Sequence, residues 1–183
     1  PTLDTHGELQ RFKTHPSVAP MLQNGQCIAY GARALNEGGY QAIPDLSFPG
    51  GIIVGCGAGF LNVPKIKGTR AAIESGMLGA EAIFEHIHKQ KNSPRIVAYD
   101  KKVKDSWIWP ELYRVRNIRP GFYRGLWLGL MNAAFESYLS FGHSPWTMAL
   151  RKDHLQLEPA KKHQPITYPK SDGKLIFNKL ESV

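Results

Sequence analysis

The sequence predicts an α/β fold with mixed α+β character, and three observations lead to it. Residues 51–55 form a short β-branched run between glycines, which is typical of a strand buried on both faces. From Thr69 onward, apolar residues recur every three or four positions over about 20 residues, as in an amphipathic helix. The 183 residues are 42% hydrophobic and 21% charged, which excludes a wholly disordered or collagen-like chain.

The first fifty residues carry few strong signals. The pattern predicts one short helix from about Gly7 to Lys13, and a strand over residues 27–30 after a turn at Asn24 and Gly25. Gly38 and Gly39 then interrupt the chain. No internal repeat is visible.

The strand at 51–55 leads into Gly55, Gly57 and Gly59, whose alternate spacing permits tight turns and a close approach of a ligand to the backbone. A helix follows, with Thr69 as its expected cap. A strand, a glycine turn and a helix N-terminus together suit a phosphate or an anionic ring. The spacing differs from the dinucleotide-binding fingerprint, so a purely structural turn is the alternative. The apolar row of the helix is Ile73, Met77, Ala80, Phe84 and Ile87, and Gly76 and Gly79 predict a close-packed neighbour.

Residues 91–105 are charged and predict a hinge-like segment. Arg114, Arg116 and Arg119 follow, and they predict a solvated or lipid-facing basic strip, with phosphate binding as the alternative. A turn with flanking strands is expected around residues 171–173 near the C-terminus.

The segment 121–146 has an uncharged stretch from Gly125 to Phe135. It is too short and too interrupted to span a bilayer, which needs about 20 apolar residues. Its aromatic ends and basic flanks favour a helix lying in the membrane interface, while an amphipathic core helix is the alternative. One face carries Trp127, Met131, Ala134, Tyr138 and Phe141, and the other carries Arg124, Asn132, Glu136 and Ser140.

The net charge of +8 predicts attraction to anionic partners. Because no base-reading module occurs, we expect no nucleic-acid partner. Cys27 and Cys56 are too few for a four-ligand zinc or iron–sulfur site, and they are expected to be buried thiols. No metal site is therefore expected in this chain. The start at Pro1 without a presequence predicts a piece of a longer protein.

Longer blocks of sequence indicate a family. The blocks are GARALNEGG at 31–39, FPGG at 48–51, GCGAGFLNVPKIKGT at 55–69, SGML at 75–78, SWIWPELY at 106–113, RNIRP at 116–120, PWT at 145–147 and YPKSDG at 168–173. Together they resemble electron transfer flavoprotein–ubiquinone oxidoreductase nearly end to end and in family order. The resemblance covers the middle-to-late part of the family's length, without its N-terminal dinucleotide fingerprint or its C-terminal cluster cysteines.

The resemblance implies a membrane-associated flavoenzyme that takes electrons from electron transfer flavoprotein, carries them on FAD and a 4Fe-4S cluster, and reduces ubiquinone. The cluster would lie only in the full-length protein. The implied location is the mitochondrial inner membrane or the bacterial cytoplasmic membrane, with monotopic contact. Electron transfer by cofactors needs no catalytic side chain, and the isolated fragment is expected to be inactive.

The implied fold is part of a glutathione-reductase-like FAD-binding domain joined to part of a ubiquinone-binding domain. Residues 1–24 would end a first ubiquinone-domain segment, and 25–98 would be the C-terminal part of the FAD-binding domain. Residues 99–183 would form a second ubiquinone-domain segment, with membrane contact over 121–146.

The resemblance also implies site residues. In related flavoproteins an Asp usually stands where this chain has Cys56, and Thr69 is the first candidate for a hydroxyl hydrogen bond to the flavin ring, followed by Gln41 and Asn62. Candidates for FAD contact are Gly38, Gly39, Gln41, Gly55, Cys56, Gly57, Gly59, Asn62, Lys67, Gly68 and Thr69. Candidates for membrane contact are Phe122, Leu126, Trp127, Leu130, Met131, Phe135, Tyr138, Phe141 and Trp146.

Two other functions remain open on the sequence. One is another FAD-dependent reductase of the geranylgeranyl-reductase-like superfamily, which would lack the cysteine-rich region expected after Val183. The other is a basic membrane-surface module that binds lipid without a flavin.

Overall fold

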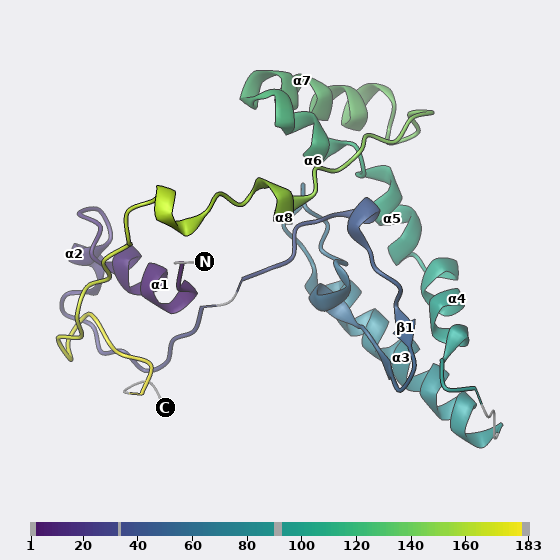
Figure 1. Cartoon of the computed structure of the whole chain (residues 1–183), viewed down its shortest axis with the longest axis horizontal. Coiled ribbons are helices and arrows are strands. Elements are labelled where there is room, and N and C mark those ends of the chain that lie inside the picture. The colour runs from purple at the N-terminus through teal and green to yellow at the C-terminus, as the bar shows by residue number, and fades with distance from the viewer. Residues whose placement is uncertain (1–2, 33, 90–92, 181–183) are drawn as a thin grey trace. The chain divides into compact units, whose positions relative to one another are not determined.

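The computed structural model describes residues 3–32, 34–89 and 93–180, and it divides the chain into two compact units (Figure 1). One unit is Leu35–Lys152. The other combines Pro1–Ala34 with Asp153–Val183. The predicted boundaries between functional domains, at residues 24 and 98, do not have to coincide with the boundaries of the compact units. They remain a prediction.

The larger unit is mostly helical. It begins with the 3-10 turn η1 (Tyr40–Ala42), the strands β1 (Ser47–Phe48) and β2 (Gly51–Ile52), and the 3-10 turn η2 (Gly55–Ala58). Three helices follow, α3 (Thr69–His88), α4 (Val97–Asp105) and α5 (Ile108–Arg114). The buried core lies where these three helices meet the strands, and its largest members are Leu46, Phe60, Tyr99, Ile108 and Leu112.

The α/β prediction holds only in part, because the sheet is small. Strands β1 and β2 are antiparallel, with Ser47 opposite Ile52, and both residues of β2 are half-buried. The predicted strand at 51–55 is thus two residues long and not buried on both faces. A β-branched run is buried on both faces only when strands flank it on both sides, and within the described residues β1 is its sole ladder partner.

Helix α3 has the predicted extent but begins differently. Gly68 is its N-cap and Thr69 its first residue, so the prediction that Thr69 caps it is wrong. A Cβ added to Gly79 would lie 2.7 Å from Cδ1 of Ile52, which confirms the close neighbour there. A Cβ added to Gly76 would meet open space, so the same prediction fails at that position.

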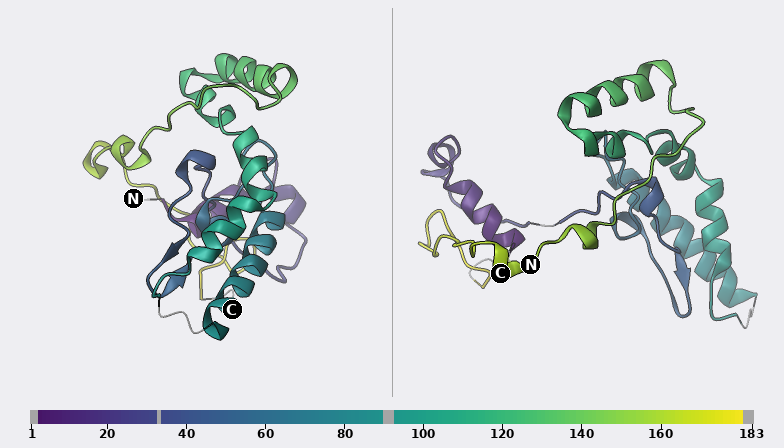
Figure 2. Two further views of the ribbon diagram at one scale, coloured as in Figure 1. Left: turned by 90° about the vertical axis from the view of Figure 1, so that its right-hand side faces the viewer. Right: turned by 45° about the horizontal axis from the view of Figure 1, so that its top comes forward.

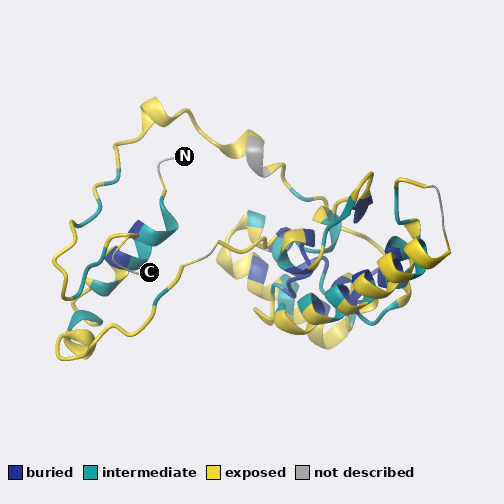
Figure 3. Cartoon of the chain, turned by 90° about the horizontal axis from the view of Figure 1, so that it is seen from below, coloured by how far each residue is buried: buried dark blue, intermediate teal, exposed yellow. Residues whose placement is uncertain are grey.

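The buried face of α3 is made of small residues, namely Ala71, Ser75, Gly79 and Ala82. Its large apolar residues lie on the other side, where Ile73, Met77, Phe84 and Ile87 are each more than half exposed. Figure 3 shows the helices of this unit with buried residues on one side and exposed residues on the other. Small side chains let α3 approach β2 and α4 closely, and this close approach decides which face packs.

The predicted hinge at 91–105 is wrong from Val97 onward, where α4 begins. Tyr99 and Val103 lie one turn apart on this helix and are fully buried. Lys101, Lys104 and Asp105 are exposed, whereas Asp100 and Lys102 are half-buried. The many charged residues predicted a hinge, but Tyr99 and Val103 are enough to pack this segment as a helix.

A helical hairpin ends the larger unit (Figure 2). It consists of α6 (Ile118–Gly121), the 3-10 turn η3 (Phe122–Arg124), α7 (Leu126–Ala134) and a π-helix (Phe135–Leu139). Gly129 of α7 leaves no room for a Cβ against the ring of Phe122, so the two arms pack closely. Across the described parts of the chain, no helix is long and apolar enough to cross a membrane.

The smaller unit contains α1 (Thr5–Lys13), α2 (Ala19–Leu22), α8 (Asp153–Gln156) and the 3-10 turn η5 (Ala160–Lys162). Asp4 caps α1 by accepting a hydrogen bond from the backbone N–H of Gly7 at 3.1 Å, which confirms the predicted helix with an earlier start.

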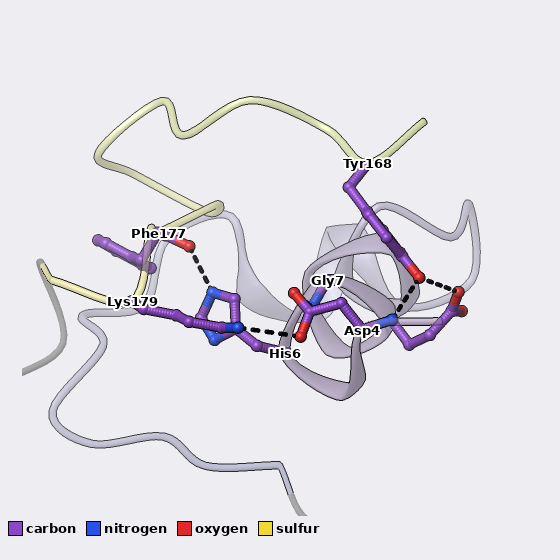
Figure 4. A network of polar contacts seen from close by, with 7 residues as sticks. Asp4, His6, Gly7, Tyr168, Phe177 and Lys179 are labelled. Atoms are coloured by element: carbon purple, nitrogen blue, oxygen red, sulfur yellow. Dashed lines mark hydrogen bonds and ion pairs between the residues drawn. The ribbon is translucent and has the colours of Figure 1, made fainter. Parts of the chain in front are cut away.

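Segments near both ends of the chain meet on α1 (Figure 4). The Tyr168 hydroxyl accepts the Asp4 N–H at 2.9 Å and donates to Glu8 Oε1 at 3.1 Å. The Lys179 ammonium lies 3.0 Å from Asp4 Oδ1. These contacts pin residues 168–179 against a helix that begins more than 160 positions earlier, at Thr5.

The strand expected at residues 27–30 is absent. This stretch has no regular secondary structure, Ile28 is 92% exposed, and Cys27 is exposed rather than buried. A strand needs a ladder partner, and none of the described residues pairs with this segment. The turn at Asp172 does form, because its carboxylate accepts three backbone N–H groups within 2.9 Å, but no strands flank it.

Candidate functional site

The glycine turn η2 is pressed against helix α3. Gly55 and Gly59 have φ values of 62° and 83°, in the left-handed region that favours glycine. The Gly55 N–H donates to Ser75 Oγ at 2.9 Å, and a Cβ on Gly55 would lie 3.2 Å from that of Ala72. Buried Ser75, which the sequence analysis did not single out, therefore fastens the turn to the helix.

The N-terminus of α3 lies against the same turn. A Cβ on Gly68 would be 3.4 Å from Cys56 Sγ and 3.0 Å from Leu61 Cδ1. Cys56 is half-buried and Gly57 exposed. Thr69 follows as an exposed residue at the first helical position. The structure thus brings together the FAD candidates of the turn and of the helix start.

Asn62 and Lys67 are joined by an antiparallel bridge with N···O distances of 3.0 and 3.3 Å. The Asn62 side chain is 2% exposed. Its Nδ2 donates to Glu111 Oε1 at 2.8 Å, while its Oδ1 accepts the Lys65 N–H at 3.3 Å. Asn62 therefore shapes the loop before α3, with both ends of its amide in contact with this chain.

A pocket of about 450 Å³ opens at the N-terminus of α3, within the size range of ligand sites. Lys65, Lys67 and Arg70 line it, opposite Glu111. The Arg70 guanidinium carbon lies 4.2 Å from the centre of the Trp107 ring. A helix N-terminus carries a partial positive charge, so these cations and α3 together attract an anionic group.

Glu111 is the counter-charge in this pocket. Its partial burial acts to raise its pKa, but hydrogen bonds from Asn62 and Lys65 and the charges of Lys65 and Arg70 outweigh that effect. The pKa of Glu111 is consequently held below its ordinary value. Its negative charge at neutral pH partly offsets the three cations of the pocket.

The other FAD candidates lie beside η1. The Gly38 N–H donates to Asn36 Oδ1 at 2.9 Å, and Gly39 has a φ of 74°. A Cβ on Gly59 would lie 3.7 Å from Asn36 Nδ2, so Asn36 stands between the two glycine segments. Asn36 is not among the predicted site residues, although an Asn two residues before a glycine is a recognised turn signal.

Gln41 is engaged with the chain itself. Its Nε2 donates to the backbone oxygens of Arg116 at 2.7 Å and of Met148 at 3.0 Å. An amide nitrogen has two hydrogens, so both donors are used and only Oε1 remains for another group. Its predicted contact with the flavin ring is thereby limited to that of an acceptor.

The basic strip expected at Arg114, Arg116 and Arg119 is wrong for Arg116. Its side chain is 2% exposed and is surrounded by backbone oxygens of its own unit, whereas Arg114 is exposed. Arg119 is half-buried, and its guanidinium donates to the Tyr123 hydroxyl at 3.0 Å. The three side chains therefore lie in three different environments, exposed, buried and half-buried.

All nine membrane-contact candidates are exposed. The largest exposed fractions are those of Trp127 at 77%, Tyr138 at 76% and Met131 at 69%, on α7 and the π-helix. Leu128 and Leu139 extend the same surface, at 53% and 72%. Of the polar face predicted opposite them, Asn132 and Ser140 are half-buried and Glu136 is fully buried, so these three face the protein, whereas Arg124 is exposed. So much exposed apolar surface is unusual for a soluble protein and marks an interaction site.

Residues 1–35 match a family model described as the ubiquinone-binding region of electron transfer flavoprotein–ubiquinone oxidoreductase. The mitochondrial enzymes of that name from pig and human are each 47% identical to this chain over 191 aligned residues. The Arabidopsis thaliana enzyme is 49% identical over 179 residues. The chain is homologous to this oxidoreductase.

The homology extends over the whole chain, which confirms the family inferred from the sequence blocks. The alignments cover 100% of this chain but 31% of the pig and human proteins, and 97% against 28% for the Arabidopsis protein. This homologue of electron transfer flavoprotein–ubiquinone oxidoreductase thus spans about a third of the length of its relatives. The relatives' names place them in mitochondria.

Proposed function

We propose that this chain is part of a membrane-associated flavoenzyme that passes electrons from reduced electron transfer flavoprotein, through FAD and a 4Fe-4S cluster, to ubiquinone. Identity of 47% along the entire chain is the observation that carries the proposal. The relatives are mitochondrial, which supports a mitochondrial inner membrane, and a bacterial cytoplasmic membrane is the other expected setting.

The same proposal assigns each segment of the chain to a domain of the enzyme. Residues 25–98 belong to the FAD-binding domain, and 1–24 and 99–183 belong to the ubiquinone-binding domain. The cluster and the remainder of the FAD site come from the other two-thirds of the enzyme's length. Segments with different functions can share one compact unit, because packing follows surface complementarity.

The residues at the start of α3 fit FAD by their chemistry. Bound FAD supplies a ring that accepts and releases electrons. The Thr69 hydroxyl is placed at the helix N-terminus to donate a hydrogen bond to that ring. The positive end of α3, with Lys67 and Arg70, stabilises negative charge there by about 0.3–1 kcal/mol per contact. Cys56 adds no charge, so the backbone of the glycine turn provides the polar contacts around it.

The exposed face of α7 and the π-helix serves membrane contact in this proposal. The isoprenoid tail of ubiquinone partitions into lipid, so the entrance for this substrate must face the bilayer. A helix with no charge between Gly125 and Phe135 and with most of its large side chains exposed suits the interface. Arg124 and Arg151 provide positive charge beside it for anionic headgroups.

The first test concerns Thr69 in the full-length enzyme. Replacing Thr69 with Val removes the hydroxyl and preserves the shape, whereas Thr69→Ser keeps the hydroxyl and is the matched control. Losing one hydrogen bond to the reduced ring, worth about 0.5–1.5 kcal/mol, lowers the flavin midpoint potential by about 10–30 mV. Equal potentials in the Val variant and the wild type would contradict the role of Thr69.

The cofactor content of the full-length protein tests the wider proposal. A visible spectrum with flavin and iron–sulfur contributions agrees with it. Flavin without iron points to the geranylgeranyl-reductase-like alternative, and a colourless protein that binds lipid points to the membrane-surface module.

A further inference from the structure

Arg116 is a buried cation in the turn between α5 and α6. Its side chain is 2% exposed and packs over the Tyr113 ring, with the guanidinium carbon 3.7 Å from the ring centre. Each of its three nitrogens donates hydrogen bonds. The acceptors are Thr147 Oγ1 at 2.9 Å and the backbone oxygens of Tyr113 at 2.9 Å, Gly142 at 3.0 Å, Ser144 at 2.6 Å and Trp146 at 3.0 Å.

Four of these five acceptors belong to residues 142–147, the loop that follows the π-helix. The backbone is strained where the chain enters this loop, because Phe141 has a φ of 50°. Gly142 follows with a φ of 75°, in the left-handed region that favours glycine. A Cβ on Gly142 would also overlap the backbone oxygen of Arg114. The Gly142 N–H donates to the Glu136 oxygen and the His143 N–H to the Ser140 oxygen, both at 2.8 Å, so local bonds hold only the start of the loop. The planar guanidinium of Arg116 adds hydrogen bonds along the loop as far as Thr147.

A buried anion balances this cation from the π-helix. Glu136 is 2% exposed, and its Oε1 accepts the Ser144 hydroxyl at 2.9 Å and Asn117 Nδ2 at 3.0 Å. Ser144 thus contacts both charges, through its backbone oxygen to Arg116 and through its hydroxyl to Glu136. Burying a charge is costly unless the charge is hydrogen-bonded. Arg116 and Glu136 are both hydrogen-bonded, and Ser144 contacts the two of them.

The backbone of Arg116 faces the other predicted site. Its carbonyl oxygen accepts Gln41 Nε2 at 2.7 Å, and the same nitrogen reaches the Met148 oxygen at 3.0 Å. Gln41 lies two residues after Gly39 in the segment predicted to contact FAD. One residue is therefore connected both to this segment and to the loop below the apolar surface.

We propose that Arg116 is a positioning residue that holds the loop 141–147, with Phe141 and Trp146, in line with the apolar surface of α7. This inference rests on the proposed membrane surface. The Phe135 and Trp146 rings, stacked with their centres 6.1 Å apart, show that the loop continues the exposed face.

The test replaces Arg116 with Lys in the full-length enzyme. Lys keeps the positive charge but lacks the planar fork, so most of the loop contacts are lost. Arg114→Lys is the matched control, because it makes the same change at an exposed position two residues away. Each enzyme is bound to vesicles that contain brominated lipid. The same measurement is made in a Trp146→Phe background. The part of the quenching that is lost there comes from Trp146 and reports how deeply Trp146 lies in the lipid.

We expect Arg116→Lys to bind vesicles through α7 and to retain flavin. Quenching assigned to Trp146 falls, and the KM for a long-tailed quinone rises about fivefold, as expected from one or more lost hydrogen bonds. The kcat with a water-soluble acceptor stays that of the wild type. Wild-type quenching and KM in Arg116→Lys would overturn the inference.

A milder variant guards against misfolding. Thr147→Val removes only the hydroxyl that accepts from Arg116 Nε, so the fold is kept and the same shift appears at smaller size. If Arg116→Lys does not fold, this variant decides the question, and an unchanged Trp146 signal in it overturns the inference. A wild-type enzyme that does not bind vesicles would instead refute the proposed membrane surface.

Discussion

Helices α3 and α7 are both amphipathic, and both turn their large apolar side chains away from the packed interior of this chain. Each packs through small residues, Gly79 of α3 against Ile52 and Gly129 of α7 against Phe122. They differ in what borders the exposed apolar row. On α3, acidic residues lie within a turn of it, and Lys102 pairs with Glu81 and Glu85 at 3.1 and 3.0 Å. On α7, no charge occurs between Gly125 and Phe135.

This difference indicates that the exposed apolar faces of α3 and α7 are covered by different partners. A narrow apolar row flanked by ion pairs is the pattern of a helix that packs against protein. A helix that is apolar around most of its circumference, with aromatic residues at its ends, suits lipid. We therefore expect α3 to be covered by another part of the full-length enzyme and α7 by the membrane.

The largest expected effect tests α7. Replacing Trp127, Met131 and Phe135 with Ser in the full-length enzyme removes apolar surface that lipid would bury. At about 1.5 kcal/mol or more for each side chain, vesicle affinity falls more than a hundredfold, while FAD stays bound. Sedimentation with vesicles measures the affinity, and flavin absorbance measures the cofactor.

The matched control changes Ile73, Met77 and Phe84 of α3 to Ser. We expect vesicle binding to persist and the free energy of unfolding of the full-length enzyme to fall, because protein covers this face. If both triple variants reduced vesicle binding alike, the contrast between the two helices would be lost.

A smaller effect comes from two glycines of α3 that lie one turn apart. Gly79→Leu forces a side chain against Ile52 and lowers the free energy of unfolding by about 1–3 kcal/mol. Gly76→Ala meets open space in this chain, so it raises stability by up to about 1 kcal/mol through helix propensity.

Urea unfolding of both variants, in this chain and in the full-length enzyme, sharpens the comparison. A gain from Gly76→Ala that vanishes in the full-length enzyme would indicate that another segment approaches α3 closely there. A gain of equal size in both proteins would speak against such cover.

The smallest effect is a pH dependence under the buried face of α3. Tyr99 is fully buried and donates its hydroxyl hydrogen to the Ile53 oxygen at 3.0 Å. Burial raises the pKa of Tyr99 from 10.0 to about 12. The unfolded chain ionises first as the pH rises, so this contribution to stability is complete below pH 10 and is lost toward pH 12.

Tyr99→Phe removes this pH dependence and lowers stability at neutral pH by about 1 kcal/mol, the value of one hydrogen bond. Tyrosinate absorbance during an alkaline titration, compared between the variant and the wild type, measures the ionisation. An ordinary tyrosine titration at Tyr99 would contradict its burial beneath α3.

Sequence patterns predicted the features that depend on neighbouring residues. The extent of α3, the helix at α1, the glycine turn at residues 55–59 and the apolar surface at 121–146 all follow from periodicity, capping and backbone freedom. The long block through Lys67 and Thr69 was specific enough to indicate the family. Each of these features is encoded within about twenty residues along the chain.

Only the tertiary structure decided which face packs and which polar side chain is buried. Arg114 and Arg116 look alike in the sequence, yet one is exposed and the other is fixed by residues 26 to 31 positions away. Likewise, the run at 51–55 became a short half-buried strand because its partners, and not its composition, set its burial. Burial and hydrogen bonding depend on distant segments that converge in space, and a local pattern carries no record of that convergence.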